Sequence, residues 1–160
     1  MVFMSYSVSR PMSCLPAKLQ SISSEDPLRE AAVDVVTALA MAAANIATVI
    51  RFSDADAALG VVRGSANVDG DDQKALDILA DEIIKNALSE VTAVASYLSE
   101  EQDTALQIHD DGTVIVASDP LDGSSNIDTN VSIGTIFSIL PAAGGILQAG
   151  RNQIAAGFFV

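Results

Sequence analysis

The chain has 160 residues, of which 49% are hydrophobic, so it can form one domain with a core and is too apolar to stay disordered. Its net charge of −13 argues against nucleic acid or an anionic membrane as a partner. The single cysteine, Cys14, excludes an internal disulfide and fits a reducing compartment, so we expect a cytoplasmic protein.

Residues 1–24 contain seven serines and no acidic residue, which predicts a disordered tail, with a transit peptide as the weaker alternative. We expect the domain to cover residues 25–160. Ser24-Glu25-Asp26-Pro27 is typical of a helix start. Apolar residues then recur at spacings of three and four, from Leu28 to Val49, and predict a helix that ends near Arg51–Ser53. Its uncharged run, Val35–Ile50, is short for a membrane span, so we expect a buried helix of a soluble domain.

A second helix is predicted to begin near Asp71 or Asp72. Asp81 and Lys85 have the spacing of an i,i+4 ion pair on its surface. Its predicted buried stripe consists of Leu76, Leu79, Ile83 and Ala87.

Strands are predicted over Thr92–Leu98, Thr113–Ala117, Ser132–Leu140 and Ile154–Val160. Asp110-Asp111-Gly112 is a hairpin-type turn signal before the second of them. Two helices followed by strands predict an α+β layered sandwich, with N-terminal helices packed on a mixed, largely antiparallel sheet. Because the last strand reaches the end of the sequence, we expect a truncated product that is incomplete at its C-terminus.

Acidic residues are concentrated in the middle of the chain. Asp69–Asp128 holds 15 of them against two basic residues, Lys74 and Lys85. A solvated acidic face explains such a pattern, and so does a set of carboxylates that holds divalent cations.

The run Ser118–Asp128 carries the strongest signal for chemistry. Asp119 and Asp122 lie three residues apart around Pro120, so a turn there could direct both carboxylates and the Leu121 carbonyl at one hard cation such as Mg²⁺. The glycine and serines that follow could bring backbone N–H groups to a phosphate. The alternative is an Asp-Pro turn followed by a serine helix cap.

Other acidic residues could join this site. Glu100 and Glu101 follow a predicted strand, while Asp71 and Asp77 belong to the second helix. Each alone is typical of a protein surface, but together with Asp119 they could converge on one cation cluster.

Asp119–Asp128, which reads DPLDGSSNID, and Val131–Phe137, which reads VSIGTIF, resemble the signature of fructose-1,6-bisphosphatases. The shorter Asp-Pro-x-Asp-Gly is shared with inositol monophosphatases of the wider lithium-sensitive superfamily. Further segments that resemble the bisphosphatase family are Gly70-Asp71, Lys74-x-Leu76-Asp77, Ser99-Glu100-Glu101, Gly150-Arg151-Asn152 and Ala155-Ala156-Gly157.

The resemblance implies hydrolysis of the 1-phosphate of fructose 1,6-bisphosphate, or a related sugar bisphosphate, in gluconeogenesis or the Calvin cycle. It implies two or three Mg²⁺ ions per site, for which Mn²⁺ can substitute, and a homotetramer at full length. The implied residues fall into three groups. The metal ligands are Asp71, Glu100, Asp119, the Leu121 carbonyl and Asp122; the catalytic residues are Asp77, Glu101, Asp119 and Asp122; the phosphate-binding residues are Gly123, Ser124 and Ser125.

The family's last metal-ligating glutamate and most of its sugar contacts belong to a C-terminal half that this sequence does not contain. We therefore expect the 160-residue chain to be inactive alone. Three alternatives stay open: a sedoheptulose-1,7-bisphosphatase, an inositol-phosphatase-like enzyme, and a non-enzymatic truncated remnant.

Overall fold

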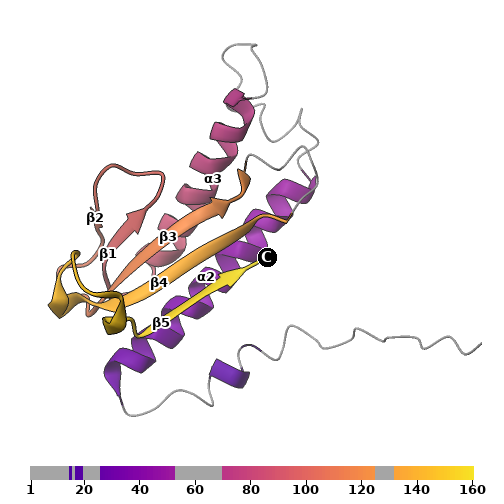
Figure 1. Cartoon of the computed structure of the whole chain (residues 1–160). Coiled ribbons are helices and arrows are strands. Elements are labelled where there is room, and N and C mark those ends of the chain that lie inside the picture. Colours follow the sequence, from indigo (N-terminus) through magenta and orange to yellow (C-terminus); the bar gives the residue numbers. More distant parts are fainter. Residues whose placement is uncertain (1–14, 16, 20–25, 53–69, 125–131) are drawn as a thin grey trace, which may run out of the picture.

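Two helices cover one face of a five-stranded sheet (Figure 1). The computed structural model describes residues 15, 17–19, 26–52, 70–124 and 132–160. The helices are α2 (Pro27–Phe52) and α3 (Gly70–Ser89). The strands are β1 (Val94–Ser99), β2 (Leu106–Gln107), β3 (Val114–Asp122), β4 (Gly134–Pro141) and β5 (Ala155–Phe159), and two short 3-10 helices, η3 (Ala142–Gly144) and η4 (Gly150–Asn152), lie between β4 and β5.

The strand order is β2-β1-β3-β4-β5. β1 and β3 pair in parallel, whereas the other three neighbouring pairs are antiparallel. The sheet is therefore mixed and largely antiparallel, with helices on one face, and the predicted fold class is confirmed. Most of the predicted tail, residues 1–24, lies outside the described residues.

The turn at Asp110–Gly112 does not close a hairpin between neighbouring strands, so that prediction is wrong. β2 turns back along β1, and the chain then crosses the start of β1 to enter β3 on its other side. The crossing is tight: a Cβ added to Gly112 would lie 2.2 Å from the Ala95 nitrogen. The glycine is needed for this close approach of two backbone segments.

Helix α2 begins as expected. The Leu28 N–H donates to Asp26 Oδ1 at 3.1 Å, so Asp26 caps the helix and Pro27 occupies its first turn. Val35 and Leu39 are fully buried in the core beneath the sheet. By length and composition Pro27–Arg51 could cross a membrane, but core helices pass the same test. The burial of its inner face favours a core helix.

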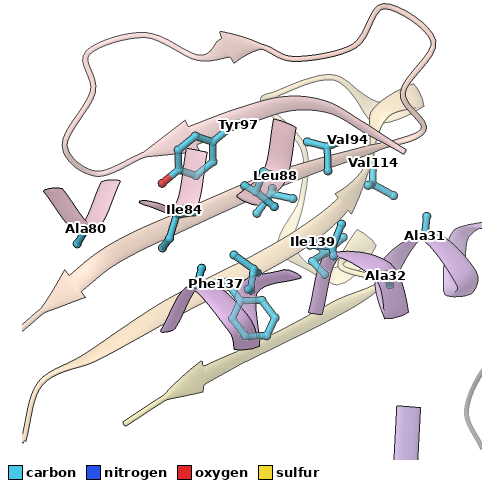
Figure 2. Packing of buried hydrophobic residues seen from close by; sticks show 14 of the residues in the cluster. Ala31, Ala32, Ala80, Ile84, Leu88, Val94, Tyr97, Val114, Phe137 and Ile139 are labelled. Atoms are coloured by element: carbon cyan, nitrogen blue, oxygen red, sulfur yellow. The ribbon is translucent and has the colours of Figure 1, made fainter. Parts of the chain in front are cut away.

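Helix α3 buries a different stripe from the predicted one. Ala80, Ile84 and Leu88 are at most 2% exposed and join α2 and the strands in one apolar cluster (Figure 2). Leu79 is instead 37% exposed, and Leu76, Ile83 and Ala87 are only partly buried at the edge of the cluster. The apolar residues of α3 cover more than one face, so spacing alone did not select the stripe that faces the sheet.

The predicted Asp81–Lys85 ion pair is also wrong. Lys85 pairs with Glu82, one turn before it. Asp81 is 1% exposed and accepts hydrogen bonds inside the protein from Tyr97 and Gln102. Asp81 therefore belongs to the interior despite its i,i+4 spacing to Lys85, because strand β1 and the loop after it supply hydrogen-bond donors for its carboxylate.

Candidate active site

The parallel pairing of β1 and β3 brings two acidic segments to the same edge of the sheet. Ser99 lies opposite Ser118 in the register, and the Glu100 N–H donates to the Ser118 carbonyl at 3.0 Å. Glu100, directly after β1, and Asp119, within β3, therefore lie at neighbouring positions of two adjacent strands. Ligand sites commonly form at the carboxyl ends of parallel strands.

Asp119–Asp122 lies inside strand β3, not in a turn after it as the sequence predicted. The register with β4 shifts between Asp119 and Asp122, which marks a bulge. Within the bulge the Leu121 N–H donates to Asp119 Oδ1 at 3.1 Å, and Thr135 Oγ1 donates to the Pro120 carbonyl at 2.9 Å. Local hydrogen bonds therefore fix the Asp119 carboxylate and the backbone beside it.

Gly123 and Ser124 follow this bulge, and Ser124 makes a hydrogen bond to helix α3. Gly123 has φ of +84°, a conformation that favours glycine. Ser124 Oγ donates to Asp77 Oδ2 at 3.2 Å. The other oxygen of Asp77 is buried and has no hydrogen-bond partner among the described residues. A buried carboxylate oxygen without a donor is costly, unless a ligand satisfies it.

Five carboxylates influence one another at this edge, and we call them the acidic cluster. Its members are Asp77, Glu100, Glu101, Asp119 and Asp122. Burial is the main cause that raises the pKa of Asp77, and the charge of Glu100 raises it further against the lowering effect of the Ser124 hydrogen bond. Burial likewise raises the pKa of Asp119, with added repulsion from Asp122 and Glu100.

Glu101 shows the largest effect. Partial removal from water, then repulsion from Asp77 and interactions with Glu100, raise its pKa from the ordinary 4.5 to about 7. Such a carboxyl group exchanges protons near neutral pH, as a general base or acid requires. Among the described residues, no basic side chain contributes to these pKa shifts.

The donor set suits a hard divalent cation, which prefers several oxygen ligands. The unpartnered Asp77 oxygen and the mutual repulsion of the carboxylates favour such an occupant. Among the described residues, however, no three acidic, His or Cys side chains are close enough to hold one metal ion as they stand. The side chain of Asp71 and all of Ser125 lie outside the described part of the chain.

A groove of about 720 Å³ reaches the cluster. Its lining includes Glu100 and Asp119 together with Leu98, Ile136 and Phe158. Each of these three apolar residues is more exposed than its two neighbours along its strand, so they belong to the sheet face away from α2 and α3. Two members of the acidic cluster are therefore open to a ligand from that face.

The sequence did not indicate a second set of polar residues beneath the cluster. Tyr97 is 2% exposed and donates its hydroxyl hydrogen to Asp81 Oδ1 at 2.9 Å; its oxygen also lies 2.9 Å from Ser118 Oγ. Burial is the main cause that raises the pKa of Tyr97. The only trace of it in the sequence is that Ser96 and Ser99 lie on either side of Tyr97 near the end of a buried strand.

An α+β sheet with acidic residues at its parallel strand ends agrees with the layered sugar-phosphatase class expected from the sequence. The family profile described as "Fructose-1-6-bisphosphatase, N-terminal domain" matches residues 19–160. The chain therefore belongs to the fructose-1,6-bisphosphatase family, and it corresponds to the N-terminal part of that family.

Individual relatives agree with this assignment. A class 1 fructose-1,6-bisphosphatase of Azorhizobium caulinodans is 48% identical over 155 residues, which are 91% of this chain and 47% of the relative. One from Cereibacter sphaeroides is 50% identical over 131 residues, covering 79% of this chain and 39% of the relative. The crystal structure of the Leishmania major enzyme in holo form gives a TM-score of 0.65 at 26% identity, covering 80% of this chain and 39% of that one. The chain thus spans about half the length of its relatives or less.

Proposed function

We propose that this chain supplies the cation-binding and water-activating part of an enzyme that hydrolyses the 1-phosphate of fructose 1,6-bisphosphate. The observation that carries the proposal is the acidic cluster, which gathers carboxylates from α3, from the turn after β1 and from β3, and in which the pKa values of Asp77, Glu101 and Asp119 are raised. The relatives are fructose-1,6-bisphosphatases, so fructose 1,6-bisphosphate is the substrate to test. Their bacterial origin supports a cytoplasmic enzyme.

The residues that would hold Mg²⁺ are Asp71, Glu100, Asp119, Asp122 and the Leu121 carbonyl. When bound, the cations would lower the pKa of the attacking water and offset the negative charge of the phosphate. The chain already holds Asp119 by the Leu121 N–H, which reduces the freedom that this carboxylate would lose on binding.

Asp77 and Glu101 would take the proton from the attacking water. Glu101, with a pKa of about 7, can accept a proton near neutral pH. Asp77 is held by Ser124 through one oxygen, and the other has no partner among the described residues, so that oxygen can accept a hydrogen bond from water. Gly123, Ser124 and Ser125 would orient the reacting phosphate.

The first experiment measures Mn²⁺ binding to the 160-residue chain by calorimetry. We expect binding that Asp119→Asn and Asp122→Asn each weaken by about tenfold or more, since each removes a charged ligand. Asp110→Asn is the matched control, because Asp110 is exposed in the turn before β3 and outside the cluster. Equal binding by the parent, Asp119→Asn and Asp110→Asn proteins would contradict the proposal.

The second experiment measures phosphate release from fructose 1,6-bisphosphate. The chain is tested alone and joined to the C-terminal half of the Azorhizobium caulinodans relative. We expect Mg²⁺-dependent turnover only from the joined protein, and its loss in Asp119→Asn. Sedoheptulose 1,7-bisphosphate and inositol 1-phosphate serve as competing substrates; preference for either one would replace the proposed substrate. Turnover that persists in a chelator would refute the role of the cation.

A further inference from the structure

Asp81, a buried aspartate outside the acidic cluster, is linked by hydrogen bonds to both backbone segments that carry the cluster's residues on the sheet. Asp81 lies one helical turn after Asp77 on α3, and each of its carboxylate oxygens accepts a hydrogen bond from an uncharged group. Oδ1 accepts from the Tyr97 hydroxyl at 2.9 Å, and Oδ2 accepts from Gln102 Nε2 at 2.7 Å. A carboxylate that is almost fully buried requires such donors.

The first link leads to β3. Because Tyr97 donates its only hydroxyl hydrogen to Asp81, the hydroxyl of Ser118 is the donor in the 2.9 Å contact with the Tyr97 oxygen. Ser118 directly precedes Asp119, and its carbonyl accepts the Glu100 N–H. The hydrogen-bonded chain from Asp81 thus ends at the backbone that carries Asp119 and Glu100.

The second link leads to the end of β1. Gln102 follows Glu101, and the Gln102 N–H donates to the Ser99 carbonyl at 3.2 Å, while the Glu101 N–H donates to Ser99 Oγ at 3.2 Å. The turn at Glu100 and Glu101 is therefore held from both of its ends.

We propose that Asp81 is a positioning residue, which through Tyr97 and Gln102 fixes the strand ends bearing Glu100, Glu101 and Asp119 relative to helix α3. The inference rests on the proposed function, because it assigns Asp81 to the placement of the cation ligands. Asp81 is 1% exposed and has a protein donor on each oxygen, so we assign it no direct contact with the ligand. Partners that hold ligating side chains in place commonly alter metal affinity by about tenfold or more when removed.

Mn²⁺ binding to the 160-residue chain tests this role. Tyr97→Phe removes one hydroxyl without changing the charge, and Asp81→Asn changes the acceptor itself. We expect each substitution to weaken Mn²⁺ binding by about tenfold. Because both disturb the link between Asp81 and Tyr97, the affinity of the double variant should lie within about twofold of the affinity of the weaker-binding single variant. Glu82→Gln is the matched control: it removes one charge from the next position of α3, and we expect its affinity to stay within about twofold of the parent.

A spectroscopic measurement remains available if a variant fails to fold. The sequence has two tyrosines and no tryptophan, so in a Tyr6→Phe protein Tyr97 is the only source of emission near 300 nm. We expect the Tyr97 fluorescence to change as Mg²⁺ is added, with half of the change at the Mg²⁺ concentration that half-saturates the site. This change should vanish in Asp119→Asn.

The outcomes separate the two proposals. Folded Tyr97→Phe and Asp81→Asn proteins with parental Mn²⁺ affinity, or Tyr97 emission that ignores bound Mg²⁺, would overturn the positioning role alone. A parent that binds no Mn²⁺, or binds it independently of Asp119, would overturn both. An equal loss in Glu82→Gln would show a general effect of charge and would overturn the positioning role as well.

Discussion

Replacing Glu101 by Gln should stabilise the metal-free chain at alkaline pH. Burial and the charges of Asp77 and Glu100 raise the pKa of Glu101 from 4.5 to about 7. The folded protein therefore holds the proton more tightly than the unfolded chain, and folding is opposed once Glu101 ionises. The free energy of unfolding should fall as the pH rises from about 4.5 to about 7, and it should stay lower above that range.

The size of the effect follows from the pKa difference and from exposure. A change from 4.5 to about 7 corresponds to about 3 kcal/mol at 1.36 kcal/mol per pKa unit. Glu101 as a residue is exposed, and its carboxyl group is only partly removed from water. Solvent therefore screens the repulsion, and we expect about 1 kcal/mol. For a chain of this size that corresponds to a rise in Tm of about 3 °C.

Thermal and urea unfolding of both proteins, in a chelator, at about pH 8 and about pH 4, would measure this difference. Glu90→Gln is the matched control, because this substitution removes the same charge from an exposed residue directly after α3 and outside the cluster. At the lower pH both states of Glu101 are protonated, so the gain should disappear. A gain that is the same at both pH values, or that Glu90→Gln reproduces, would refute the argument.

Three other perturbations test the fold and the cluster. Gly112→Ala should cost about 2 kcal/mol or more in urea unfolding, because its Cβ would lie 2.2 Å from the Ala95 nitrogen; unchanged stability would contradict the tight crossing. Asp26→Ala should lower the free energy of unfolding by about 1 kcal/mol, because the Leu28 N–H loses the carboxylate that caps α2; Asp26→Asn should lower it less. Adding about 10 mM Mg²⁺ should raise Tm more at about pH 8 than at about pH 5, where protons compete for Glu101 and Asp119; equal shifts would argue against carboxylate ligands.

The sequence predicted the elements of the fold well, since their signals are local. Asp26-Pro27 marks the start of α2, and β-branched residues mark β4. The crossing after β2 could not be predicted in this way, because Gly112 is the same signal in a hairpin and in a close backbone approach. Only the pairing of β1 with β3 decides between them.

The same limit applied to helix α3. Its apolar residues occur at several helical spacings, and the choice of buried stripe depends on which side faces the sheet. Asp81 was assigned to the surface because its interior partners, Tyr97 and Gln102, are 16 and 21 residues away. Hydrogen bonds between distant segments leave no periodic trace in the sequence.

The two aspartates of α3, Asp77 and Asp81, differ in how their oxygens are satisfied. Asp81 accepts one hydrogen bond on each oxygen, so both of its oxygens have neutral donors inside the protein. Asp77 accepts only the Ser124 hydroxyl in the described structure, keeps a buried oxygen without a partner and has a raised pKa. A group left in that state is costly to the fold. Ligand binding can offset that cost at Asp77, whereas Asp81 is 1% exposed and already has a donor on each oxygen, which suits it to hold its neighbours in place.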